Sequence, residues 1–175
     1  ILSFAQEINF KLVQRDKNDV GGVVLGMTQD THGFLWLATQ VGLYKYDGYQ
    51  YISYHPTSNP NSPAADLIEC IASDRRGYVW LAPVRTGLDR LDPVTGIFTH
   101  FRHKKNDPGS LASDTVLAIL QDHDATMWIG TQHGLDRFDD KSNKFLHYEN
   151  NPNDPSSLSC NTVRALYEDK QGTIW

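Results

Sequence analysis

DTHGFLWLATQVGLYKYD, residues 30–47, returns with few changes further along the chain. Residues 74–92 read DRRGYVWLAPVRTGLDRLD, residues 122–139 read DHDATMWIGTQHGLDRFD, and DKQGTIW at 169–175 opens a fourth copy. The tryptophans that close the D-x-x-G-x-x-W part are 44, 48 and 47 residues apart: Trp36, Trp80, Trp128 and Trp175. Self-similarity at one fixed period of this size is typical of a repeat architecture.

Each copy predicts four short strands joined by turns. The Asp-x-x-Gly part has turn chemistry, because the Asp side chain bonds nearby backbone and Gly takes a positive φ. The Trp lies on the second strand, a Gly-Leu step begins the third, and an aromatic pair marks the fourth. The first strands are expected over residues 23–29, 67–73, 116–121 and 163–168.

Four antiparallel strands per repeat predict an all-β fold, a partial β-propeller of four-stranded blades. We expect one propeller domain over residues 1–175. Its parts are an outer strand at 9–14 around Phe10 and Val13, blades at 22–55, 66–103 and 114–149, and two strands of a fourth blade at 160–175. Apolar residues alternate on both sides of each first strand, so we expect both faces of that strand to be buried between blades.

The full phrase resembles the two-component regulator propeller repeat, as do the links NDPGSLASDTV (106–116) and NDPSSLSCNTV (153–163). The resemblance implies the periplasmic, ligand-sensing part of an inner-membrane hybrid two-component system, with a glycan or oligosaccharide as the signal. It also implies a transmembrane helix, a histidine kinase and a DNA-binding output elsewhere in the protein. The chain departs from the pattern at Ala125, at Pro83 and in the longer loop at Arg85 and Thr86.

Composition excludes several functional classes. A net charge of −5 argues against nucleic-acid binding through this domain. No stretch has the roughly 20 apolar residues of a membrane span. The two cysteines, Cys70 and Cys160, lack metal-ligand spacing and are expected to be buried thiols. We therefore expect no metal and no cofactor. Open blade edges predict contact with the rest of a propeller or with a second copy.

Residues that recur once per repeat are expected to be structural: Asp30, Asp74, Asp122, Asp169 and the four tryptophans. Residues that break the repeat are the candidate ligand-binding residues. Glu69 and Arg164 occupy the position five residues before the repeated Asp, on inner strands that would line a central channel. The loops after the second strands add polar groups that suit sugar hydroxyls, carboxylates or sulfates, namely Gln40, Arg85, Gln132 and His133.

Two alternatives to glycan sensing stay open on the sequence alone. The first is a scaffold for protein–protein interaction, a common use of propellers. The second is a fragment of a propeller glycosidase or lyase, for which only Glu69 is a plausible acid. No nucleophile elbow, P-loop or metal-binding histidine spacing is present, so we expect this chain to be non-catalytic.

Overall fold

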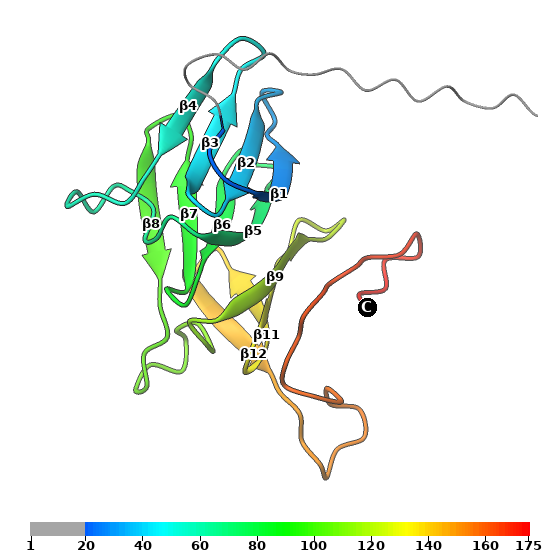
Figure 1. Cartoon of the computed structure of the whole chain (residues 1–175). Helices are drawn as coiled ribbons and strands as arrows, with labels where there is room; N and C mark the ends of the chain where they lie inside the picture. Colours follow the sequence, from blue (N-terminus) through cyan, green and yellow to red (C-terminus); the bar gives the residue numbers. More distant parts are fainter. Residues whose placement is uncertain (1–19) are drawn as a thin grey trace, which may run out of the picture.

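The computed structural model describes residues 20–175, and its regular structure is entirely β (Figure 1). Three separate four-stranded sheets follow one another along the chain, each an antiparallel meander of consecutive strands. The first has β1 (Val24–Gln29), β2 (Leu35–Thr39), β3 (Gly42–Tyr46) and β4 (Tyr51–Tyr54); the second has β5 (Ile68–Ser73), β6 (Val79–Pro83), β7 (Leu88–Asp92) and β8 (Ile97–Phe101); the third has β9 (Val116–Gln121), β10 (Met127–Thr131), β11 (Gly134–Asp139) and β12 (Lys144–Tyr148). The predicted fold class, a partial propeller of four-stranded blades, is confirmed.

The first strands of the three sheets lie side by side. β5 contacts β1 on one side and β9 on the other. The sheets therefore converge at their first strands, as blades of a propeller do around an axis. Within residues 20–175 there is no helix long and apolar enough to cross a membrane.

The repeated Asp organises the turn between the first two strands of each sheet. In the second copy, Asp74 Oδ1 accepts hydrogen bonds from the backbone N–H groups of Arg76 (3.0 Å) and Tyr78 (2.9 Å). Asp74 Oδ2 accepts a third bond from Trp80 Nε1 at 2.8 Å. The same bond joins Asp to Trp in the other three copies. The carboxylate is therefore a structural clasp rather than a catalytic group.

The turn also requires a backbone with positive φ at its fourth position. Gly77 has a φ of 91° there, and Ala125 replaces the glycine in the third copy with a φ of 63°. An L-residue adopts this region only at some cost. Ala125 nevertheless donates its N–H to Asp122 O at 3.0 Å, so the turn forms without the glycine.

Each buried tryptophan packs against the following sheet. Trp36 belongs to one core cluster with residues of the second sheet, among them Val79, Leu81 and Phe98. Trp80 belongs to a second cluster with residues of the third sheet, including Phe138 and Phe145. The core therefore lies between blades, which is where the repeated aromatic residues place it.

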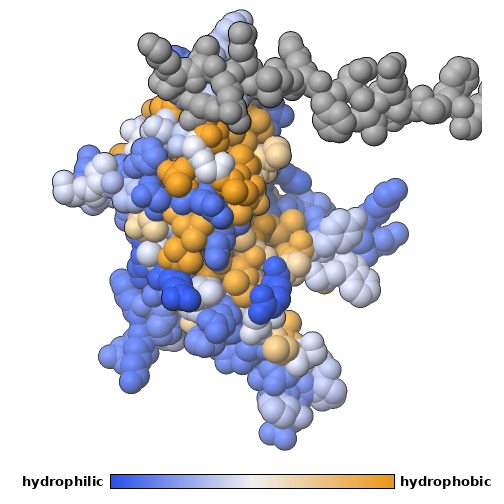
Figure 2. Space-filling model, viewed as in Figure 1, coloured by the Kyte–Doolittle hydropathy of each residue, from blue (hydrophilic) through white to orange (hydrophobic). Residues whose placement is uncertain are grey.

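The prediction that both faces of every first strand are buried was wrong for β1. Met27 is 65% exposed, and Val24 is also exposed, because no sheet precedes β1 among residues 20–175. Figure 2 shows hydrophobic residues gathered over the region of β1 and β5 in this view. The outer strand predicted at 9–14, with Phe10 and Val13, lies outside the described residues.

The first two strands predicted within 160–175 do not form a sheet. The described residues there hold a single bridge between Glu168 and Ile174, and Figure 1 shows the chain running out beyond β12 and returning beside β9. Beside this bridge, the backbones of Tyr167 and Trp175 exchange two hydrogen bonds, at 3.0 and 2.7 Å. The turn itself persists, since Trp175 bonds Asp169 although its side chain is 72% exposed.

Candidate functional site

The first strands of the three sheets and the segment after the third sheet line an open hollow of about 390 Å³. Its lining consists of the residue five positions before the repeated Asp in each copy, together with one cysteine: Leu25, Glu69, Leu117, Arg164 and Cys70. The structure thus brings Glu69 and Arg164 to one cavity, although 95 positions separate them in the sequence. We call this cavity the axial hollow.

Apolar and charged groups share the axial hollow. Leu25 and Leu117 supply its apolar lining, while Glu69 and Arg164 are exposed and bring opposite charges. Such a lining can accept a ligand with an apolar face and groups that hydrogen-bond to a carboxylate and a guanidinium. Binding by these residues remains a prediction.

Cys70 is half-buried at the base of the axial hollow. Its Sγ–H donates to Leu117 O at 3.0 Å. Burial, with a smaller contribution from the negative charge of Glu69, raises the pKa of the Cys70 thiol to about 11. Cys160 differs, because it is exposed; the expectation that both thiols are buried was therefore wrong for Cys160.

We expect iodoacetamide at pH 8 to alkylate Cys160 at least tenfold faster than Cys70. The thiolate is the reactive species, and a thiol with a pKa of about 11 is ionised to only about one part in a thousand at pH 8. Peptide mass spectrometry after timed quenching measures both rates in one sample. Equal rates in the folded chain, with no acceleration of Cys70 in denaturant, would contradict the protection of Cys70 by burial.

The four candidate loop residues lie apart from the axial hollow. All are exposed and occupy the turns between the second and third strands of their sheets: Gln40, Arg85, Gln132 and His133. The links between sheets reach the same end of the molecule, since Gly87 N–H donates to Asp114 O (2.9 Å) and Gly134 N–H to Asn161 O (2.6 Å). None of the four lines the axial hollow, so the structure separates the six candidate binding residues into two groups.

Sequence reasoning missed a buried Asp–His pair in the second and third sheets. Asp136 on β11 is fully buried and accepts hydrogen bonds from His147 Nδ1 (2.7 Å) and from the backbone N–H of Ala112 (2.8 Å). His147 Nε2 bonds Pro108 O at 2.9 Å. The pair therefore fastens the link before the third sheet to its outer strands.

The second sheet has the same arrangement. Asp89 bonds His100 Nδ1 (2.7 Å) and the backbone N–H of Ala64 (2.9 Å), and His100 Nε2 bonds Pro60 O at 2.8 Å. In both sheets Asp and His face each other across the third and fourth strands, 11 residues apart. The first copy has Tyr44 and Ser53 at the matching positions. The Asp–His spacing that recurs in the second and third copies is the sequence feature that could have indicated the pair.

The Asp136 and His147 side chains shift each other's pKa values. Burial raises the pKa of Asp136, although the hydrogen bonds from Ala112 and His147 act against this. Burial would lower the pKa of His147, but its hydrogen bond and charge interaction with Asp136 raise it overall. Both ring nitrogens of His147 face acceptors, which requires a proton on each side of the ring. The pair is thus fully bonded and structural rather than free for catalysis.

Among residues 20–175, no group of three or more His, Cys, Asp or Glu side chains is placed to hold a metal ion. His123 has two acidic neighbours, Glu168 and Asp124, and its side chain is largely exposed. The hydrogen bond to Glu168, followed by the charge of Asp124, raises the pKa of His123. This cluster joins the turn of the third copy, through His123, to Glu168 of the fourth copy.

One family model matches part of the chain. The family model described as two-component regulator propeller matches residues 110–133 and 157–175. No curated protein matches the chain in sequence.

Solved structures share the fold. The extracellular domain of a hybrid two-component system from B. thetaiotaomicron is 28% identical with a TM-score of 0.79, over 92% of this chain and 23% of that one. A second such domain from the same organism is 16% identical, with a TM-score of 0.52, over 93% and 27% of the two chains. Virginiamycin B lyase from Staphylococcus aureus is 18% identical, with a TM-score of 0.61, over 87% and 47%. The chain thus spans about a quarter of the first two structures, and the lyase shows only that the fold is shared.

Proposed function

We propose that this chain, which carries two-component regulator propeller repeats, is part of the periplasmic ligand-sensing domain of such a regulator, and that a glycan is the signal. The observation that carries the proposal is the likeness to the extracellular domain of a hybrid two-component system, together with the axial hollow. The chain then works by binding rather than catalysis. The rest of the propeller, or a second copy, covers the open faces.

The axial hollow supports a role in sensing because it joins separate blades. Leu25, Cys70 and Leu117 come from β1, β5 and β9, and Arg164 comes from the segment after the third sheet. A ligand held by Glu69 and Arg164 would contact the second blade and the segment after the third blade at the same time. Its binding energy would favour one arrangement of these blades, which is how a ligand biases a distant output.

The test is a glycan screen with the 175-residue chain, followed by calorimetry with the oligosaccharide that binds best. We expect Glu69→Gln and Arg164→Met each to weaken binding about tenfold or more, because each removes a charge-assisted hydrogen bond. Arg137→Met is the matched control, since Arg137 is exposed on β11 and does not line the hollow. Bound ligand is also expected to slow the alkylation of Cys70 in denaturant-free buffer.

Three results would count against the proposal. If no glycan binds, glycan sensing by this chain is wrong and the protein-interaction scaffold becomes the better hypothesis. If binding is unaffected in both axial variants but lost when Gln132 and His133 are replaced, the ligand site lies on the loop face. If an oligosaccharide is cleaved, the chain is an enzyme.

A further inference from the structure

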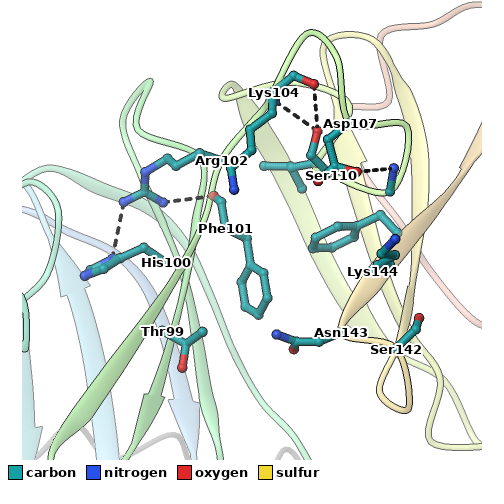
Figure 3. A pocket seen from close by; sticks show the side chains of 13 residues that line it. Thr99, His100, Phe101, Arg102, Lys104, Asp107, Ser110, Ser142, Asn143 and Lys144 are labelled. Carbon is teal, nitrogen blue, oxygen red and sulfur yellow. Dashed lines mark hydrogen bonds between the residues drawn. The ribbon is translucent and has the colours of Figure 1, made fainter.

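A second pocket lies at the seam between the second and third sheets, well away from the axial hollow. Its volume is about 290 Å³, close to the lower end of the range for small-molecule sites. Three elements form it: β8, the link at 102–111 and the turn that leads into β12. We call it the seam pocket; Figure 3 shows its lining residues.

The seam pocket has an apolar floor and a polar rim. The floor is formed by Phe101, Leu111 and Phe145, whose side chains are almost fully buried, and the rings of Phe101 and Phe145 stand at 88° with centroids 5.5 Å apart. Thr99 and Asn143 lie across from each other at its lower edge in Figure 3. A floor of this kind accepts the apolar face of a ring, and the rim offers hydrogen bonds to its substituents.

Positive charge dominates the rim. Arg102 is already committed, since its guanidinium bonds Leu88 O, Phe101 O and the buried Asp89. The two lysines of the rim are Lys104 and Lys144. The rim has a single carboxylate, that of Asp107, which accepts a hydrogen bond from Gly109 N–H. In Figure 3 the side chain of Lys104 runs from the link toward Phe101, over the pocket. The local excess is therefore cationic in a chain whose net charge is −5.

These lysines are not required by the repeat. Lys104 N–H donates to Ser110 Oγ, and the matching residues Thr57 and Asn151 make the same bond at the other two links without a charged side chain. Lys144 begins the fourth strand of its sheet, as Ile97 does in the preceding one. The fold therefore forms these links and strands without a lysine at either position. What Lys104 and Lys144 have in common is that both line the seam pocket.

Gly109 lets Lys144 lie against the link. A Cβ atom at residue 109 would stand 2.6 Å from Lys144 Cδ, closer than side chains allow. Phe145 N–H donates to Gly109 O at 2.9 Å, which joins the turn to the link at this point. The lysine is thus held beside the pocket by the same contact that closes the seam.

From these observations we infer that the seam pocket binds a small ring-shaped organic anion, a monosaccharide-sized ligand carrying a carboxylate or sulfate group. Phe101 and Phe145 contact its apolar face, Lys104 and Lys144 pair with its anionic group, and Thr99 and Asn143 bond its hydroxyls. This site is independent of the axial hollow, so either one can bind if the other does not.

The test is a titration of the 175-residue chain with D-glucuronate, followed by NMR, with D-glucose as the neutral counterpart and inorganic sulfate as the bare anion. We expect glucuronate to shift the amide signals of Thr99, Asn143 and Lys144, and to bind at least tenfold more tightly than glucose. The double variant Lys104→Ala/Lys144→Ala is expected to lose at least tenfold in affinity. Higher salt is expected to weaken glucuronate binding, because the ion pair between the ligand and the two lysines is partly exposed and therefore screened.

Neighbouring lysines give the matched control, since Lys105→Ala/Lys141→Ala removes the same charge from the same link and turn without touching the pocket. Equal loss in both double variants, or equal affinity for glucose and glucuronate, would overturn the anion site. An absence of glucuronate binding at millimolar concentration would overturn it as well. Binding that survives Glu69→Gln and Arg164→Met would support the seam pocket even where the axial proposal fails.

Discussion

Trp80→Ala is expected to lower the free energy of unfolding by about 3–5 kcal/mol, the cost of removing a large buried aromatic side chain. Trp80 is 1% exposed, and its ring stacks on Phe101 with centroids 5.8 Å apart and meets the edge of Phe138 at 5.1 Å. Truncation leaves a cavity at the centre of the seam between the second and third sheets. Urea denaturation of the 175-residue chain, followed by circular dichroism, measures the change.

Trp175→Ala is the matched control. Trp175 makes the same Nε1–H bond to its repeated Asp, 2.9 Å long against 2.8 Å for Trp80, but its side chain is 72% exposed. Its truncation removes the local bond without opening a core cavity, so we expect a cost of about 1 kcal/mol or less. Similar costs in the two variants would show that the clasp with Asp, rather than packing between blades, makes this tryptophan important.

The clasp and the strands could be predicted from sequence because both are local. Asp74 bonds groups within six residues of itself, and even the fourth copy forms its turn without a sheet behind it. The predicted first strands at 23–29, 67–73 and 116–121 agree with β1, β5 and β9 to within one residue. Of the four predicted first strands, the one at 163–168 does not form, because strand pairing depends on residues outside the Asp-x-x-Gly turn.

Contacts between repeats were harder to predict. The axial hollow follows from repeat position alone, so Glu69 and Arg164 could be placed together before the structure was known. The buried Asp136–His147 pair needed the pairing register of β11 and β12, in which Asp136 faces His147. The seam pocket forms where a link and a turn from neighbouring sheets come into contact. The periodicity of a single repeat does not predict this contact.

Asp89→Ala is expected to cost about 3–5 kcal/mol of stability, because removing one member of a buried, charged hydrogen-bond group leaves its partners unpaired. Asp89 is fully buried on β7 and accepts bonds from Ala64 N–H, His100 Nδ1 and Arg102 Nη2 at 2.9, 2.7 and 3.0 Å. Alanine leaves an N–H, an imidazole and a guanidinium without their acceptor. The link before the second sheet is then free to detach, and amide hydrogen exchange at Ala64 is expected to speed up with the fall in stability.

Asp92→Ala separates this effect from the loss of any carboxylate on β7. Asp92 lies three residues further along the strand, and its carboxylate bonds groups of its own turn, among them the N–H groups of Val94 at 2.9 Å and Thr95 at 3.3 Å. Its replacement is expected to cost about 1 kcal/mol and to leave exchange at Ala64 unchanged. Asp89→Asn, which keeps an acceptor for Ala64, is expected to fall between the two. A stability for Asp89→Ala equal to that of Asp92→Ala would mean that the link is held by its own turn bonds, and that the Asp89–His100 pair is dispensable for holding it.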